Sequence, residues 1–264
     1  MRTRYLKSGF PELEENISLL LEISVMLMQS GGNTKRVISC INRFAAAMEL
    51  KSHALISHKS IIMTLTDLKT GKHYTEVTQI PSYHINFLQL SEISRASWKA
   101  VDYNWNYEKI KQRIEIIKQQ KSYPKLLVWF SVSMAGAAFA RLFGGDYTNM
   151  LVSFVATFFG LLALHYSIHF IENRYIRTYL ASSIASIIAG ISIVQEWGEK
   201  PEIALATAVL FLVPGVQLIN SFNDLYNNHI LNGTVRFISG IMIVLSIGLG
   251  MISAMVLLHI NVLN

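Results

Sequence analysis

Residues 211–224 read Phe211-Leu212-Val213-Pro214-Gly215-Val216-Gln217-Leu218-Ile219-Asn220-Ser221-Phe222-Asn223-Asp224. This segment is apolar enough to cross a membrane, yet it contains a Pro-Gly pair and then turns polar. Proline removes a backbone donor and interrupts the helical hydrogen bonds, and lipid offers nothing to replace them. The freed carbonyl groups need protein, water or a ligand, so the segment predicts a helix break that faces a cavity.

The rest of the chain supports a membrane class. Of 264 residues, 52% are hydrophobic and 15% are charged, and the mean hydropathy is +0.36. These values exclude an ordinary water-soluble enzyme. Five apolar segments approach the roughly 20 residues that span a bilayer. They are Tyr123 to Phe143, Tyr147 to Ile171, Ile176 to Glu196, Ile203 to Phe222 and Val235 to Val262.

Charge predicts the orientation of these spans. Residues 1–125 carry 18 Lys or Arg against 11 Asp or Glu, whereas residues 126–264 carry 5 against 6. A basic excess beside membrane spans fits an anionic cytosolic leaflet better than nucleic acid. The positive-inside rule places the N-terminus and the 171–177 loop in the cytosol and the C-terminus outside. No cleavable signal peptide is visible at the start.

The first 122 residues predict a small cytosolic α+β domain, followed by a membrane domain over 123–264. Apolar residues recur at helical spacing from Phe10 to Met28 and stop at Ser30-Gly31-Gly32, after which Asn33 or Thr34 can cap a second helix. We expect a three-stranded antiparallel sheet next. Its strands are His53 to Ser57, Ser60 to Leu68 and His73 to Ile80. Further helices follow, the last a solvated linker helix over 107–121. The predicted fold is an α-helical polytopic membrane protein with five spans.

Polar residues after the break form the candidate substrate site. Eleven residues at 1.5 Å each place Pro214 near the bilayer midplane if the span enters at Ile203. Gln217, Asn220, Ser221 and Asp224 then share one helical face. The new helix end offers free N–H groups from Gly215 onward, which suit a carboxylate. The alternative is a packing kink followed by the interfacial end of the span.

Other chemistry-bearing residues carry weaker signals. His165, His169 and Glu172 share a helical spacing that suits a metal or a proton relay, but interfacial histidines explain it as well, and we expect no metal. Intramembrane His165 is a candidate for proton exchange.

The single cysteine, Cys40, suits a reducing compartment. Cys40 with His53 and His58 does not make a recognisable hydrolase, because no third residue or oxyanion loop is visible. No cofactor is expected.

One stretch of the chain is similar to a known family signature. It reads Leu212-Val213-Pro214-Gly215-Val216-Gln217-Leu218-Ile219-Asn220 and continues with Asp224, His229-Ile230, Gly233 and Arg236. This pattern resembles the signature of the threonine/serine exporter family. The N-terminal part agrees with that family at Gln29-Ser30-Gly31-Gly32, along the paired strands of 57–68 and over 86–94. The resemblance covers nearly the whole chain.

This resemblance implies a secondary exporter of small polar metabolites in the bacterial inner membrane, driven by the proton gradient. With five spans the chain looks like the larger subunit of the split type, which works with a separate small membrane protein, a homo-oligomer being a further possibility. Split pairs are associated with dicarboxylates such as succinate, so hydroxy amino acids and dicarboxylates both stay open. Positions that match the family pattern are Pro214, Gly215, Asn220, Asp224, His229 and Arg236.

The expected mechanism uses the helix break. The substrate carboxylate meets the N–H groups of 215–218, while Gln217 and Asn220 bind its polar groups. Asp224 guards or protonates the cytosolic route, and Arg236 attracts the anion or pairs with Asp224. His229 and His165 complete the candidates for gating or proton coupling. The competing hypothesis is a membrane-anchored cytosolic enzyme or sensor.

Overall fold

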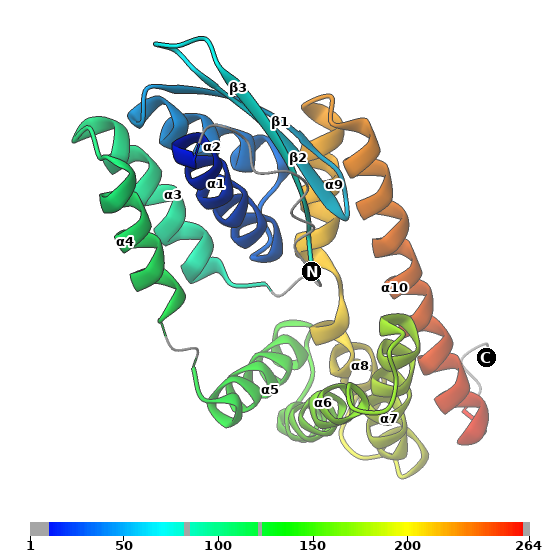
Figure 1. The fold of residues 1–264 in the computed structure, drawn as a ribbon. Helices are drawn as coiled ribbons and strands as arrows, with labels where there is room; N and C mark the ends of the chain where they lie inside the picture. The colour runs from blue at the N-terminus through cyan, green and yellow to red at the C-terminus, as the bar shows by residue number, and fades with distance from the viewer. Residues whose placement is uncertain (1–10, 82–84, 121–122, 261–264) are drawn as a thin grey trace. The chain divides into compact units, whose positions relative to one another are not determined.

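A computed structural model describes residues 11–81, 85–120 and 123–260. Over these residues the chain is mostly helical, with one small sheet (Figure 1). It forms two compact units. The N-terminal unit combines Met1–Lys121 with Val216–Phe237, and the helical unit combines Ser122–Gly215 with Ile238–Asn264. The division expected at residue 122 therefore omits a late segment that packs with the N-terminal residues.

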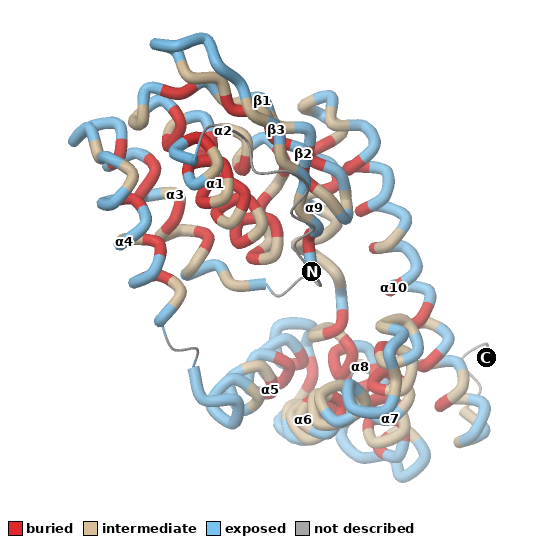
Figure 2. The backbone as a smooth tube through the Cα atoms, in the orientation of Figure 1, coloured by how far each residue is buried: buried red, intermediate tan, exposed pale blue. Residues whose placement is uncertain are grey.

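The N-terminal unit begins with the predicted helical hairpin. Helix α1 (Pro11–Gln29) and helix α2 (Thr34–Ala47) are joined by a short turn. Buried positions recur along α1 (Figure 2), and on α2 they include Val37, Ile41 and Phe44. Burying these apolar side chains supplies most of the favourable free energy of such a domain.

A three-stranded antiparallel sheet covers this hairpin, as predicted. Strands β1 (Leu50–Ile56), β2 (Ser60–Asp67) and β3 (His73–Gln79) pair in sequence order, with Leu55 opposite Ile62 and Ile62 opposite Val77. The alternating residues Ile61, Met63 and Leu65 of β2 are fully buried. Figure 1 shows the sheet lying over α1 and α2.

Two further helices complete the N-terminal residues, and one of them corrects an expectation. Helix α3 (Phe87–Asp102) packs on α2, and helix α4 (Tyr107–Lys118) packs on α3. The sequence suggested that the segment of α4 is a solvated linker. Instead, Ile110, Ile114 and Ile117 are buried, because their spacing of three and four residues forms one apolar face.

The helical unit contains α5 (Lys125–Leu142), α6 (Tyr147–Ser167), α7 (Arg174–Val194), α8 (Pro201–Ala208) and the 3-10 helix η1 (Leu210–Leu212). The last helix, α10 (Ile230–Leu257), belongs to this unit from Ile238 onward. Small residues in the interior of the helical unit, several of them alanines, let helices approach closely. A Cβ on Gly160 would lie 3.0 Å from Ala185 Cβ. Hydroxyl groups bind across the helices, with Thr207 Oγ1 donating to Ser153 Oγ at 3.0 Å.

Four helices are long and apolar enough to cross a membrane, namely α5, α6, α7 and α10, and a bent pair brings the number to five if it counts as one span. This search covers the described residues. The bent pair contains the predicted break. Helix α8 ends at Ala208, η1 follows, Val213 is extended, and α9 (Gly215–Tyr226) begins directly after Pro214. The last helix starts at Ile230, five residues before the predicted start at Val235.

Asp146 joins two loops of the helical unit and generates a testable prediction. Its carboxylate accepts the N–H of Asn149 at 2.7 Å and that of Glu199 at 2.8 Å. These two hydrogen bonds, in that order, hold the pKa of Asp146 below its ordinary value of 3.8. A lowered carboxyl pKa stabilises the fold above the pKa of the unfolded chain, and the stabilisation is lost as pH falls through the lowered value.

We therefore expect Asp146→Ala to lower the thermal midpoint of the purified protein by several degrees at pH 7, and less at pH 3. Asp146→Asn keeps one acceptor oxygen, so we expect its thermal midpoint at pH 7 to lie between those of the unaltered protein and Asp146→Ala. Asp102→Ala, at an exposed position near the end of α3, is the control. Equal destabilisation by Asp146→Ala at both pH values contradicts the assignment.

Candidate functional site

The predicted polar face of α9 is held in a tight hairpin with the start of α10. Gly233 permits the close approach, because a Cβ there would lie 2.7 Å from Leu225 Cγ. Ser221 Oγ donates to the Gly233 carbonyl at 2.8 Å, and the His229 N–H donates to the Asp224 carbonyl at 2.8 Å. The hairpin thereby brings Asp224 next to Arg236.

The turn between α1 and α2 meets this hairpin. Helix α1 ends as predicted at the glycine pair, where the Gly32 N–H donates to the Leu27 carbonyl at 2.9 Å and Gly31 adopts φ +95°. Such a positive φ favours glycine. Asn33 caps α2 by accepting the Arg36 N–H at 2.8 Å. The partially negative end of one helix and the partially positive end of the next therefore lie side by side.

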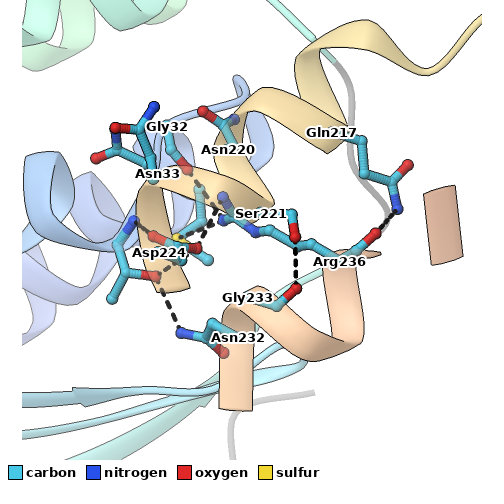
Figure 3. Close-up of polar contacts among 12 residues, drawn as sticks. Gly32, Asn33, Gln217, Asn220, Ser221, Asp224, Asn232, Gly233 and Arg236 are labelled. Atoms are coloured by element: carbon cyan, nitrogen blue, oxygen red, sulfur yellow. Dashed lines mark hydrogen bonds and ion pairs between the residues drawn. The ribbon is translucent and has the colours of Figure 1, made fainter. Parts of the chain in front are cut away.

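Asp224 occupies the positive end. Its Oδ1 accepts the backbone N–H of Thr34 at 2.8 Å, and its Oδ2 accepts the Thr34 hydroxyl at 3.1 Å (Figure 3). The residue is 1% exposed. A carboxylate at the first turn of a helix binds free N–H groups and interacts favourably with the helix dipole. The first turn of α2 is thus capped by a residue 190 positions away in sequence.

Arg236 binds the turn that follows α1. Its Nη2 donates to the Gly32 carbonyl at 3.0 Å and lies 3.7 Å from Met28 Sδ. Its Nη1 lies 3.2 Å from Asp224 Oδ2, forming an ion pair between side chains that are 5% and 1% exposed. We expected Arg236 either to attract an anion or to pair with Asp224, and the structure shows the pair.

Asn232 is a site residue that sequence reasoning missed. Its Nδ2 donates to Thr34 Oγ1 at 3.0 Å and to the Ile56 carbonyl at 2.8 Å, linking α10 to both α2 and β1. The available signal was its position four residues before Arg236, which places both side chains on one face of α10. We call Thr34, Asp224, Asn232 and Arg236 the buried polar cluster.

The other two members of the predicted stripe bind backbone carbonyls. Asn220 Nδ2 donates to the Gly31 carbonyl at 2.7 Å, and Gln217 Nε2 donates to the Arg236 carbonyl at 3.3 Å (Figure 3). Both residues are partly buried. The stripe expected to face a cavity is therefore engaged by two elements. Asn220 and Asp224 bind the turn between α1 and α2 and the start of α2, and Gln217 and Ser221 bind carbonyl groups of α10.

The remaining predicted residues lie outside this cluster. Pro214 and Gly215 form the break and the first residue of α9, and His229 lies in the turn before α10 with partial exposure. His165 lies in the last turn of α6 and is partly exposed. Its Nε2 atom is 3.5 Å from the Nζ atom of Lys125.

The structure also places the residues considered for a metal site and for a thiol hydrolase. His169 and Glu172 are both exposed, and no group of three or more metal-binding side chains occurs in the described parts of the chain. Cys40 is fully buried in the core with Arg43 Nη2 at 3.3 Å from its Sγ, whereas His53 is exposed on β1.

Comparison with known proteins agrees with this architecture. The family model for the threonine/serine exporter, ThrE, matches residues 18–258. The chain belongs to the threonine/serine exporter family. Members of this family are membrane transporters rather than enzymes, so the anchored-enzyme alternative does not hold.

Two relatives of this chain are both named "Probable succinate transporter subunit YjjP". The protein from Klebsiella aerogenes is 28% identical over 242 residues, which cover 90% of this chain and 92% of the relative. The protein from Escherichia coli K12 is 26% identical over the same shares. No solved structure shows a significant match to the chain.

The buried polar cluster generates an asymmetric stability prediction for this exporter. Asp224→Asn leaves the buried Arg236 charge without its counterion, which costs about 3 to 5 kcal/mol in comparable pairs. Arg236→Gln leaves an Asp224 carboxylate that keeps its two hydrogen bonds from Thr34 and the α2 dipole, so its cost is smaller by about 1 kcal/mol or more.

Denaturant unfolding of the purified protein measures both variants and the double variant Asp224→Asn/Arg236→Gln. We expect the double variant to be more stable than Asp224→Asn alone, because it removes the unpaired charge. Equal or reversed costs for the two single variants contradict this electrostatic account.

Proposed function

We propose that this chain is one subunit of a secondary transporter that exports small carboxylate metabolites, driven by the proton gradient. The family match supports export, and the printed names of the two relatives support a subunit that handles succinate. Threonine or serine, which the family description names, are the alternative substrates.

The proposed arrangement has five spans in a bacterial inner membrane, with the N-terminus in the cytosol and the C-terminus outside. The bent pair formed by α8 with η1 and α9 is the fourth span. Secondary transporters are commonly built from paired repeats, and the names of the two relatives describe each of them as one subunit of a transporter. We therefore propose a small membrane protein as the second subunit.

The proposed substrate site lies along α9. The Gly215 N–H, directly after Pro214, donates to the Val213 carbonyl at 2.8 Å, so the N–H groups of the next residues of the first turn attract a carboxylate through the helix dipole. Gln217 and Asn220 bind its polar groups. The observation that carries the proposal is the buried ion pair of Asp224 and Arg236, with an Nη1 to Oδ2 distance of 3.2 Å.

That ion pair suits gating. Protonation of Asp224 removes the negative charge that holds both Arg236 and the first turn of α2, so it loosens α9 from the turn between α1 and α2. His229, in the adjoining turn, and His165 are further candidates for proton transfer, because an imidazole ring can both accept and donate a proton.

An export assay in cells lacking the endogenous exporter tests the site. We expect Asn220→Ala to lower succinate export about tenfold, because it removes a donor from the substrate and from the Gly31 carbonyl. Asn223→Ala is the matched control, because this exposed asparagine donates to the Ile219 carbonyl of its own helix. Membrane abundance is measured for each variant, and unchanged export in Asn220→Ala and Asp224→Asn removes the proposed site.

Dependence on a second subunit has its own test. Deleting the gene for a short membrane protein encoded beside this chain is expected to abolish export while this chain still reaches the membrane. Co-purification of the two proteins in detergent checks their association. Full export by this chain alone in reconstituted vesicles contradicts a two-subunit transporter.

A further inference from the structure

A pocket of about 290 Å³ lies in the N-terminal unit beside the buried polar cluster. Three elements form it: the turn between α1 and α2 with the start of α2, the first turns of α3, and α9. Figure 3 labels three of the residues that line it, Gly32, Asn33 and Asn220. The lining residues are Gly31, Gly32, Asn33, Arg36, Phe87, Leu90, Ser91, Val216, Ile219 and Asn220.

Arg36 gives this pocket a positive charge that no acidic side chain among the described residues neutralises. Its guanidinium makes no ion pair or side-chain hydrogen bond within the described parts of the chain, although the residue is partly buried. The other described arginines of the N-terminal unit all have partners. Arg43 lies over Trp98, Arg95 and Arg113 pair with Glu92, and Arg236 pairs with Asp224. An unpaired guanidinium in a concave site is suited to bind a carboxylate through two parallel hydrogen bonds.

The other lining groups restrict the ligand. Asn33, Ser91 and Asn220 are neutral polar side chains, and Phe87, Leu90, Val216 and Ile219 supply apolar walls. No acidic side chain occurs among these described lining residues, so an ammonium group would have no counterion. The volume is at the lower limit of typical ligand pockets, about 300 Å³, which suits a ligand with a short carbon chain.

We propose that this pocket binds a small carboxylate without an amino group, with Arg36 holding the carboxylate and the apolar walls holding the carbon chain. The inference rests on the proposed export of carboxylates. It assigns a substrate-binding residue to α2, in the same pocket as Asn220 of α9. Helix α2 is thereby part of the substrate site in addition to anchoring α9.

Calorimetric titration of succinate into the purified full-length chain in detergent tests the pocket. We expect Arg36→Gln to weaken binding at least about tenfold, a change typical of one lost charge-assisted pair, and Arg36→Lys to weaken it less. Ser91→Phe fills the pocket and is expected to abolish binding with Arg36 in place. Lys35→Gln is the matched control, because this neighbouring exposed cation binds Asn227 outside the pocket.

The thermal midpoint of Arg36→Gln without ligand is expected to match that of the unaltered chain, because Arg36 has no internal ion pair to lose. L-Threonine and L-serine are expected not to displace succinate. Absence of succinate binding to the unaltered chain, equal binding by Arg36→Gln, or displacement by either amino acid overturns the pocket assignment.

Parallel export measurements separate the two proposals. Export that needs this chain but is insensitive to Arg36→Gln and Ser91→Phe leaves the proposed function standing and rejects the pocket. Binding that depends on Arg36 in a chain that exports no carboxylate rejects the proposed function and keeps the binding site.

Discussion

The ion pair between Asp224 and Arg236 is the interaction on which the N-terminal unit depends, because it matches the electrostatics of two helix ends. Helix α1 ends and α2 begins within a few residues, so carbonyl groups and N–H groups without helical partners lie close together. Asp224 binds the N–H group of Thr34, and Arg236 binds the carbonyl of Gly32. Each charge therefore meets its counterion and a backbone group, and Asp224 also lies at the positive end of α2. These contacts offset the cost of burying the two charges.

This arrangement ties distant parts of the sequence into one unit. Residues 216–237 pack with the first 121 residues, although by composition α9 also qualifies as half of a bent span. The polar stripe of α9 makes this possible, because its side chains replace the hydrogen bonds that the turn between α1 and α2 would otherwise make with water. The same side chains are the candidates for substrate binding and gating, so binding and anchoring share one helix face.

The two arginines near this turn, Arg236 and Arg36, differ in burial and in whether they have a counterion among the described residues. Arg236 is nearly inaccessible and has its counterion within the protein. Arg36, in the first turn of α2, lines a pocket and has no counterion within the described chain. Burial of a paired charge contributes to a defined structure, whereas an accessible unpaired charge remains available to an anion.

Local rules allowed much of this protein to be predicted from its sequence. Hydrophobic periodicity defined the helical hairpin and the membrane-capable helices, Gly31-Gly32 marked the end of α1, alternation and turn residues marked the sheet, and Pro214-Gly215 marked the break before α9. These features depend on neighbours within a few residues, so sequence alone determined them. The segment of α4 was predicted to be a solvated linker helix because of its charged composition, although the spacing of Ile110, Ile114 and Ile117 forms the apolar face that is buried in the structure.

Tertiary structure alone decided what the polar stripe of α9 contacts. Sequence spacing placed Gln217, Asn220, Ser221 and Asp224 on one face, but it did not show that Thr34, Asn232 and the glycine turn cover that face. Asp224 and Thr34 are 190 residues apart, and nothing in the local pattern of either residue identifies the other. A buried carboxylate requires a donor and a counterion, and the fold supplies both by bringing the ends of α1 and α2 to the α9 and α10 hairpin.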